Sequence, residues 1–497
     1  MTHDQHRNIA FVKERYLCRQ FSEALRAAQA ALEVDPDDAE LLNLASACHL
    51  ALHNYADALT HLTRAIQEKP SFADAHNNLG VLHRAQARHD AAESSFRRAL
   101  VAQPDHPDAL LNLGSLLRSM RRLKEAESMI AQLITAAPDR PDALNLLGLI
   151  LTDQGRLDHA KTAYRRALAL QPDHAPYQLN LANALLAEGN WTEGLLLFEA
   201  RHAPFFQGAH SSPPTVPFPQ WRGEPIAGAS LLIWPEQGHG DLIHLVRYIR
   251  RLKALGSARI TLVCSYATLP LFAALPGADA VVPREAFHAS ACPMHDFWTY
   301  AWSIPYHLRE QPSTIPAELP YLRAPANAAS KWERFLPKGR LRVGLVWRGN
   351  PLNPSDSVRS LPGLKVLKPL WESGNVTFVS LQKDATAVEL QAETDQRFIV
   401  NLGSRAANFA DVAGMISRLD LVIGVDTAAM HLAAALGKPT WILISNVAAD
   451  WRWAAQGSTS IWYPGAVTLF RQEVDETDWS GVVSRASQAL SGMRTIR

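Results

Sequence analysis

The chain has 497 residues, which is too many for a single hydrophobic core and predicts three domains. Apolar residues make up 47% of the chain and charged residues 20%, as in ordinary soluble globular proteins. The formal net charge of +1, with no long basic run, gives no electrostatic basis for binding a nucleic acid.

Cysteines and hydropathy restrict the class of protein further. The four cysteines form no C-x-x-C pair, so we expect reduced thiols and neither a disulfide framework nor a zinc site. The N-terminal residues lack the apolar region of a signal peptide. The most apolar window, residues 419–444, is interrupted by Asp420, Asp426, His431 and Lys438, so no membrane span is predicted. We therefore expect a cytoplasmic protein.

The N-terminal part of the chain is repetitive. A spacing of 34 residues separates the successive prolines of one series, Pro36, Pro70, Pro104, Pro138 and Pro172. This period is typical of tetratricopeptide repeats, in which each unit is a pair of antiparallel helices. Residues 1–203 are thus predicted to form an all-α superhelix of about five repeats. A partial repeat, whose second helix is residues 22–32, precedes them.

Three asparagines, Asn78, Asn112 and Asn180, occupy the same position of their repeats, and Leu146 interrupts the series. Stacked repeats form a concave groove that commonly holds an extended peptide. In one interpretation these side chains bind the backbone of a protein or peptide partner, as in protein O-linked N-acetylglucosamine transferases. In the other, they are solvated or bond within their own repeats.

The composition changes after the repeats. Residues 204–225 are rich in proline, serine and aromatic residues and predict a stiff, extended linker. From residue 226 the pattern changes to short apolar runs, at residues 230–234, 259–264 and 280–282, that read as buried parallel strands. Helical patterns separate these runs, one of them extending to residue 255. Residues 226–325 are therefore predicted to form a first Rossmann-like half.

The first strand leads into a glycine loop. Gly238 and Gly240 give part of a dinucleotide-binding fingerprint, but Ile243 stands where the third glycine would be. A partial match of this kind does not support hydride transfer.

A second series of strands and helices occupies residues 326–497. Its strands are predicted at residues 342–347, 376–381, 398–402, 421–425 and 440–444. Asn350 follows the first of them, at the strand end where such sheets bind ligands. The two series together predict an α/β fold of two Rossmann-like halves that face each other across a cleft.

The last two of these strands enclose a helix. Asp426 and Thr427 precede the helical run 428–436, Thr427 is a candidate N-cap, and Gly437 can end the helix. His431 lies one turn after Thr427, on the same face near the positive end of the helix. Because helix N-termini attract anions, we expect this helix start to hold the diphosphate of an activated sugar.

Several motifs resemble a known family. The run 240–244, G-D-L-I-H, resembles the N-terminal loop of heptosyltransferase-type enzymes, glycosyltransferase family 9, and Asp426-Thr427 with His431-Leu432 resembles their C-terminal nucleotide-sugar motif. Five further motifs stand in the order found in bacterial proteins that join tetratricopeptide repeats to such a domain. They are W-P-E-Q-G-x-G-D, V-G-L-V-W-x-G-N-P, R-S-L-P, F-V-S-L-Q-K and D-W-R-W.

The resemblance implies a GT-B fold and inverting glycosyl transfer without a metal ion or other cofactor, with a nucleotide-sugar as substrate. Asp241 matches the family's proposed base, which would deprotonate the acceptor hydroxyl. Its alternative role is to cap a helix.

On the donor side, the resemblance assigns Asp426 and Thr427 to the nucleotide-sugar motif. Arg359 falls where heptosyltransferases often carry a phosphate-binding lysine, and Lys383 is a second cationic candidate. His431 would bond phosphate, line the pocket, or serve as a satisfied structural histidine.

Two features of the sequence bear on the acceptor. The first half is short for an acceptor domain, and no basic amphipathic surface helix is evident, which favours a soluble acceptor such as a protein held by the repeats. The alternatives are transfer to a cell-envelope glycan, or a tetratricopeptide scaffold whose transferase domain is a relic.

Overall fold

A computed structural model describes residues 3–204, 212–288, 292–337, 340–353, 355–374, 376–386, 388–390, 399–447, 449–474 and 476–493. The chain forms two compact units, the helical unit (Met1–His174) and the α/β unit (Ala175–Arg497). The predicted fold class, an all-α repeat array followed by two parallel α/β sheets, is confirmed.

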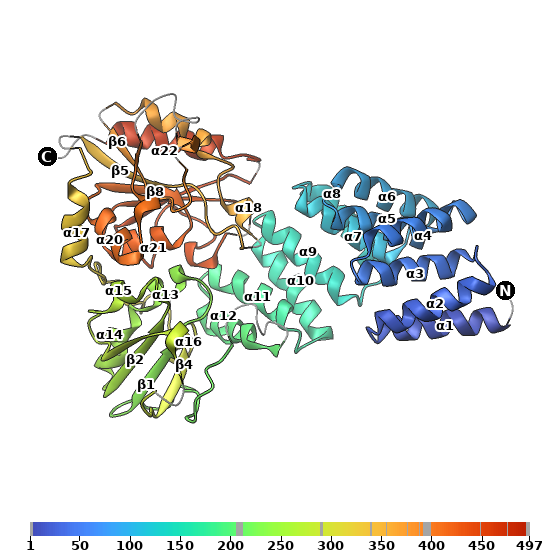
Figure 1. The fold of residues 1–497 in the computed structure, drawn as a ribbon, viewed down its shortest axis with the longest axis horizontal. Coiled ribbons are helices and arrows are strands. Elements are labelled where there is room, and N and C mark those ends of the chain that lie inside the picture. The colour runs from blue at the N-terminus through green and yellow to red at the C-terminus, as the bar shows by residue number, and fades with distance from the viewer. Residues whose placement is uncertain are drawn as a thin grey trace. The chain divides into compact units, whose positions relative to one another are not determined.

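The helical unit consists of antiparallel pairs (Figure 1): α1 (His3–Leu17) with α2 (Phe21–Val34), α3 (Ala39–Ala51) with α4 (Tyr55–Glu68), α5 (Ala73–Ala85) with α6 (His89–Ala102), α7 (Pro107–Ser119) with α8 (Leu123–Ala136), and α9 (Pro141–Asp153) with α10 (Leu157–Leu170). The repeat predicted as partial is a complete pair, because α1 precedes α2.

The recurrent glycines explain how the two helices of a pair approach each other. A Cβ atom at Gly80 would lie 2.5 Å from the ring of Phe96, and one at Gly148 would lie 2.4 Å from the ring of Tyr164. Both rings belong to the second helix of the same pair and are buried. The glycine therefore makes room for the aromatic residue that fills the core of its own repeat.

The α/β unit begins with one more helix pair, α11 (Ala175–Ala187) and α12 (Trp191–Phe198), followed by the 3₁₀ helix η1 (Glu199–His202). The repeat period predicts this pair as a further repeat, yet it packs into the core of the α/β unit. Trp191 is 1% exposed and stacks on Trp462 with ring centroids 5.0 Å apart. It also meets the ring of Trp451 edge-on at 5.7 Å.

The first sheet of the α/β unit has four parallel strands in the order β3-β2-β1-β4. They are β1 (Ser230–Trp234), β2 (Arg259–Cys264), β3 (Ala280–Pro283) and β4 (Phe297–Tyr300). The accompanying helices are α13 (His239–Leu245), α14 (Tyr248–Ala254), α15 (Leu269–Phe272), η3 (Arg284–Ala286) and α16 (Ser303–His307). The helical stretch predicted to reach residue 255 corresponds to α14, whereas α13 lies in the segment predicted as the glycine loop, and β4 was not predicted.

The second sheet has six parallel strands in the order β10-β9-β8-β5-β6-β7. They are β5 (Leu341–Val346), β6 (Val376–Ser380), β7 (Ile399–Asn401), β8 (Leu421–Val425), β9 (Thr440–Ile444) and β10 (Val467–Arg471). Residue 398, the predicted start of the third strand, lies outside the described residues, and β10 was not predicted.

Helices and 3₁₀ turns surround this second sheet: α17 (Ala326–Glu333), α18 (Asp356–Arg359), η5 (Leu364–Glu372), η6 (Gly403–Arg405), α20 (Phe409–Ser417), α21 (Ala428–Ala435), η7 (Trp451–Trp453) and α22 (Ser480–Gly492). In Figure 1, α13 of the first sheet and α21 of the second lie next to each other between the two sheets.

The strand orders locate the place where a ligand can bind. In each sheet the order reverses once, between β1 and β4 in the first and between β5 and β8 in the second. Open parallel sheets bind ligands at the carboxyl ends of the strands at such a switch point. The loops after β1 and β4 and the loops after β5 and β8 therefore bound the expected site.

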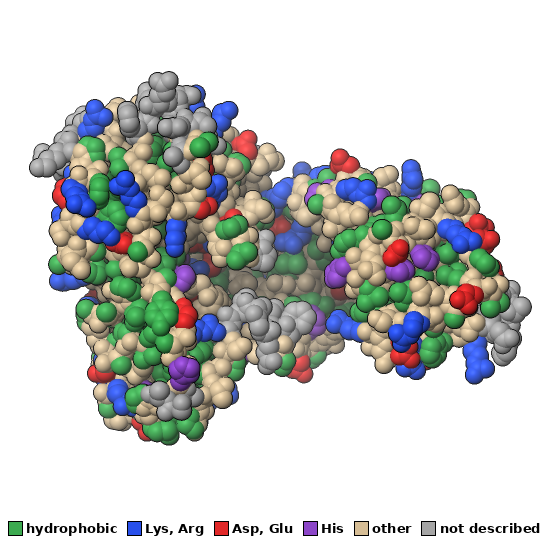
Figure 2. Space-filling model, viewed as in Figure 1, with side chains coloured by type: hydrophobic (Ala, Val, Ile, Leu, Met, Phe, Trp, Pro, Cys, Tyr) green, Lys and Arg blue, Asp and Glu red, His purple; other side chains and the backbone are tan. Residues whose placement is uncertain are grey.

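On the face drawn in Figure 2, acidic and basic side chains are interspersed over the helical unit. Among the described residues, no helix is both long and apolar enough to cross a membrane.

Candidate functional site

The start of α21 presents unused hydrogen-bonding groups. Thr427 takes the N-cap position with an extended backbone (φ −145°, ψ 168°), but its side chain makes no capping hydrogen bond. Its Oγ1 is buried and has no hydrogen-bond partner among the described residues. Within the described residues, this hydroxyl and the N–H groups of Ala428 and Ala429 make no hydrogen bond, which is the arrangement that binds anions at helix starts.

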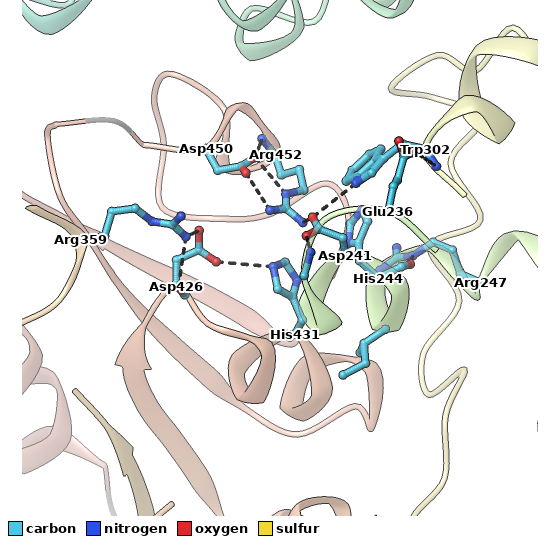
Figure 3. Close-up of polar contacts among 12 residues, drawn as sticks. Glu236, Asp241, His244, Arg247, Trp302, Arg359, Asp426, His431, Asp450 and Arg452 are labelled. Carbon is cyan, nitrogen blue, oxygen red and sulfur yellow. Dashed lines mark hydrogen bonds and ion pairs between the residues drawn. The ribbon is translucent and has the colours of Figure 1, made fainter. Parts of the chain in front are cut away.

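Asp426 precedes Thr427 at the end of β8. Its Oδ2 accepts a hydrogen bond of 2.5 Å from Nη2 of Arg359, which also donates to the Asp426 carbonyl at 3.1 Å. The carboxylate is 8% exposed. Burial alone would raise the pKa of Asp426, but the neighbouring imidazole of His431 and the charge of Arg359 hold it well below its ordinary value of 3.8. Asp426 is therefore an anion that orients Arg359 beside the start of α21 (Figure 3).

His431 lies one turn into α21 and is 2% exposed. Its Nδ1 lies 2.9 Å from the hydroxyl of Tyr463, and its Nε2 lies 3.4 Å from Oδ1 of Asp426. That Nε2 makes no regular hydrogen bond within the described part of the chain. The ring of Trp453 stacks on the imidazole at a centroid distance of 5.1 Å. Burial lowers the pKa of His431, so the neutral imidazole is favoured.

The hydroxyl of Tyr463 also links α21 of the second half to α13 of the first. It lies 2.9 Å from Nδ1 of His244, a fully buried residue of α13. Burial lowers the pKa of His244 well below 6.5, and the positive charge of Arg247 lowers it further. His244 was part of the G-D-L-I-H motif, whereas no sequence signal identified Tyr463.

Asp241 lies in the first turn of α13, at the carboxyl end of the first sheet. Its Oδ2 accepts the backbone N–H of Gly238 at 2.9 Å, so the carboxylate stabilises the start of its own helix. Its Oδ1 accepts hydrogen bonds from Nη1 of Arg452 at 2.9 Å and from the indole N–H of Trp302 at 3.3 Å. The carboxylate thus caps its own helix and also accepts hydrogen bonds from the side chains of Arg452 and Trp302, which Figure 3 shows.

Arg452, on η7, is the residue that bridges the two sides of the site. Its Nη2 donates to Asp450 Oδ2 at 2.7 Å and its Nε donates to Asp450 Oδ1 at 2.9 Å, while Nη1 reaches Asp241. The side chain is 8% exposed. The D-W-R-W motif contained Arg452, but sequence reasoning did not assign it a contact with Asp241.

Gly240 lets α13 and α21 come close together. A Cβ atom at this position would lie 3.2 Å from Cα of Ala428 and 3.2 Å from Cδ2 of His431. The first turn of α13, which carries Asp241, therefore contacts the start of α21 directly, and a side chain larger than glycine at position 240 would crowd this contact.

Two predicted donor-side residues lie away from this cluster of contacts. Lys383 is exposed. Burial lowers the pKa of His239, and the positive charge of Lys383 adds to this lowering. Asn350 is exposed, and its side-chain oxygen accepts the backbone N–H of Leu352 at 3.1 Å, so it stabilises its own turn.

The repeat asparagines bond between neighbouring repeats. Nδ2 of Asn78 donates to Oδ1 of Asn43 at 2.8 Å, and Nδ2 of Asn112 donates to Oδ1 of Asn77 at 3.0 Å. Neither of the two predicted interpretations included this arrangement. Asn180 lies on α11, in the α/β unit.

Sequence comparisons identify both parts of the chain. Tetratricopeptide repeat models match residues 19–71, 49–107, 83–150 and 141–174. The model of glycosyltransferase family 9 (heptosyltransferase) matches residues 364–444, which include Lys383, Asp426, Thr427 and His431.

A curated relative is Protein FlbA of Caulobacter vibrioides, which is 26% identical over 341 residues, or 64% of this chain and 55% of that protein. The chain thus spans about half of the length of this relative. Solved structures with similar folds include the tetratricopeptide repeat protein TTC0263 from Thermus thermophilus, with 22% identity, coverage of 36% of this chain and 98% of that chain, and a TM-score of 0.33. Another is the type IV pilus biogenesis factor PilW, with 20% identity, coverage of 42% and 99%, and a TM-score of 0.38.

The repeat models and the transferase model match separate parts of the chain, in the order that its motifs indicate. The chain therefore joins tetratricopeptide repeats to a glycosyltransferase family 9 domain.

Proposed function

We propose that the α/β unit is an inverting, metal-independent glycosyltransferase that moves a sugar from a nucleotide-sugar donor to an acceptor hydroxyl. The observation that carries this proposal is that α13, which follows β1 of the first sheet, contacts α21, which follows β8 of the second. The first turn of α13, which bears Asp241, contacts the start of α21, where the Thr427 hydroxyl has no hydrogen-bond partner within the described ranges. A carboxylate on one wall and an anion-binding helix start on the other match the two halves of a glycosyl transfer.

In the proposed reaction the acceptor hydroxyl oxygen attacks the anomeric carbon from the side opposite the diphosphate. Asp241 takes the hydroxyl proton as the new carbon–oxygen bond forms. The bond between the anomeric carbon and the phosphate oxygen breaks, and the nucleoside diphosphate leaves with the electron pair. The configuration of the anomeric carbon is inverted because the attack occurs once and from the opposite face.

The leaving diphosphate gains negative charge and must be stabilised by fixed donors. The N–H groups at the start of α21, the Thr427 hydroxyl and Nε2 of His431 supply neutral groups. Arg359, oriented by Asp426, supplies a guanidinium, and the exposed Lys383, which follows β6, supplies an ammonium group. These donors and charges are proposed to do the work of a metal ion, so a chelator should leave turnover unchanged.

The acceptor is proposed to be a protein held by the repeats. The Asn43–Asn78 and Asn77–Asn112 pairs use amide N–H groups within the array. The side-chain oxygens of Asn78 and Asn112, both partly exposed, remain as acceptors for the N–H groups of an extended peptide.

A thermal-shift panel of UDP-, GDP-, ADP- and dTDP-sugars tests the donor site. At least one sugar nucleotide should stabilise the protein, because a ligand that binds only the folded state raises its melting temperature. The substitution Thr427→Val removes the hydroxyl at constant shape and should weaken that shift. Thr299→Val, which removes a buried hydroxyl from β4, serves as the matched control.

The same sugar nucleotide should release its nucleoside diphosphate in the presence of EDTA as fast as in its absence. If none of the four classes stabilises the protein or releases nucleotide, the proposal is wrong and the scaffold alternative is supported.

A further inference from the structure

A buried ion pair ties the end of the last helix pair to the loop after β1. Arg201, on η1, is 3% exposed, and Glu236, on the loop, is 4% exposed. Nε of Arg201 donates to Oε2 of Glu236 at 3.1 Å and Nη2 donates to Oε1 at 3.0 Å. Burial would raise the pKa of Glu236, but the charge of Arg201 and the hydrogen bond from His202 lower it to about 2. Glu236 is therefore ionised and its geometry is fixed.

Glu236 in turn positions Trp302. Its Oε1 accepts the backbone N–H of Trp302 at 2.8 Å, across the switch point between β1 and β4. The indole N–H of Trp302 donates to Asp241 Oδ1 at 3.3 Å. A continuous series of hydrogen bonds thus runs from Arg201 through Glu236 and Trp302 to the Asp241 carboxylate.

The helix pair reinforces this series by packing. The ring of Phe198, in the last turn of α12, meets the ring of Trp302 edge-on at 5.9 Å. Nη2 of Arg201 also donates to Oγ of Ser303, the residue after Trp302, at 3.0 Å. Both an apolar contact from α12 and a polar contact from η1 therefore fix the position of the Trp302–Ser303 segment.

A buried ion pair is a costly way to add stability, because both charges lose their hydration. An apolar pair of the same volume would pack the helix against the loop as well. The Arg201–Glu236 pair also fixes the orientation of the Glu236 carboxylate. Its hydrogen bonds hold Glu236 where it accepts the backbone N–H of Trp302.

We propose that Arg201 is a positioning residue for Asp241, acting through Glu236 and Trp302. The proposal rests on the proposed function in assigning Asp241 to the reaction. It connects the α11–α12 pair to the transferase site, because Arg201 lies on η1, directly after α12.

The test compares Arg201→Met, Arg201→Lys and Glu236→Gln with Glu310→Gln in the full-length protein. Glu310 is also fully buried and ion-paired, with Nη1 of Arg251 at 2.6 Å, so its substitution matches the loss of a buried carboxylate. The readouts are the melting temperature, nucleotide affinity, and release of nucleoside diphosphate from UDP-, GDP-, ADP- and dTDP-sugars. Arg201→Met and Glu236→Gln should reduce release by about tenfold to a hundredfold at unchanged nucleotide affinity. Arg201→Lys should retain part of the nucleoside diphosphate release. Glu310→Gln should lower only the melting temperature.

A second readout does not depend on activity. The indole N–H resonance of Trp302, assigned by its absence in Trp302→Phe, should shift in Asp241→Asn, Arg201→Met and Glu236→Gln, but not in Glu310→Gln. An unshifted Trp302 resonance in folded Arg201→Met and Glu236→Gln variants would overturn the positioning role, as would an equal loss of release in Glu310→Gln. If Asp241→Asn keeps full release, the proposed reaction is wrong, and the resonance still decides whether Arg201 positions the Asp241 carboxylate.

Discussion

The hydroxyl of Tyr463 has one proton to share between two histidines. Because Nε2 of His431 faces the Asp426 carboxylate, the proton of this imidazole belongs on Nε2, and Nδ1 accepts from Tyr463. The Tyr463 oxygen then accepts the N–H of His244 Nδ1. His244 is thus neutral and bears its lone pair on Nε2, which is buried and without a partner among the described residues.

This arrangement predicts a loss of stability in mild acid. The folded-state pKa of His244 and that of His431 lie below the unfolded value of 6.5, so the unfolded chain takes up protons first. Their contribution to stability is complete above pH 6.5 and is lost as the pH falls from there toward the folded-state values. Denaturation at pH 7.5 and pH 5.5 should show a smaller pH dependence for His244→Gln than for wild type.

The control is His288→Gln, at an exposed position of the first half. It should keep the wild-type pH dependence. Equal pH dependence in the wild type and in a folded His244→Gln variant would contradict the assigned role of His244.

Gly240 gives a second prediction at the residue level. The substitution Gly240→Ala places a methyl group 3.2 Å from both Ala428 Cα and His431 Cδ2, so α13 and α21 must separate slightly. Overpacking of this kind costs about 1–3 kcal/mol, and the donor site should lose affinity with it. Melting temperature and nucleotide affinity measure the two effects. Gly374→Ala, where a Cβ meets nothing within 4 Å, should change neither.

At the level of elements, the last helix pair looks like a repeat and behaves as part of the α/β unit. Trp191 is buried between Trp451 and Trp462, and Ala187 accepts the backbone N–H of Ala455 at 3.1 Å. Removing the pair would expose these tryptophans and leave Glu236 without its ion-pair partner. Both changes would lower the stability of the α/β unit considerably.

A fragment of residues 175–497 is therefore predicted to fold cooperatively, whereas residues 212–497 should aggregate or remain without a thermal transition. Circular dichroism and size-exclusion chromatography compare the two. A stable, monomeric 212–497 fragment with a sharp transition would show that the helix pair is dispensable.

Elements with a clear pattern were predictable from the sequence. The strands at 230–234, 259–264 and 421–425 are as predicted, because buried parallel strands are continuous apolar runs. β4 and β10 were missed, since Phe297–Tyr300 is a short aromatic run and Val467–Arg471 ends in a charged residue. α13 was also missed, because Gly238 and Gly240 at its start are typical of a loop.

The candidate site was predictable only in part. Asp241, Thr427 and His431 were found because they follow strand ends in recognisable motifs. Arg452 and Trp302 act through contacts between segments far apart in the sequence, and no local pattern encodes such contacts.

For the whole molecule, the repeats supply the proposed acceptor surface. The double substitution Asn78→Ala/Asn112→Ala removes two bonds between repeats and also the amide oxygens of two partly exposed side chains. It should lower the stability of the helical unit by about 1–3 kcal/mol in all and reduce capture of protein partners. A pull-down quantified at a temperature where the variant is folded checks the second effect. Asn54→Ala, at an exposed N-cap without a side-chain bond, is the control, and undiminished capture by the double variant would count against a peptide-binding role.

The central claim is that a carboxylate on one sheet acts on a donor held by the other. Turnover and nucleotide affinity of Asp241→Asn, measured beside Asp279→Asn, test it most directly. Asp279 also accepts a backbone N–H, that of Ile260 at 2.6 Å, but it lies at the edge of the first sheet. Asp241→Asn should lose about 10²–10⁴-fold in turnover at unchanged nucleotide affinity, because only the proton acceptor is removed. Near-normal turnover by a folded Asp241→Asn variant would contradict the account.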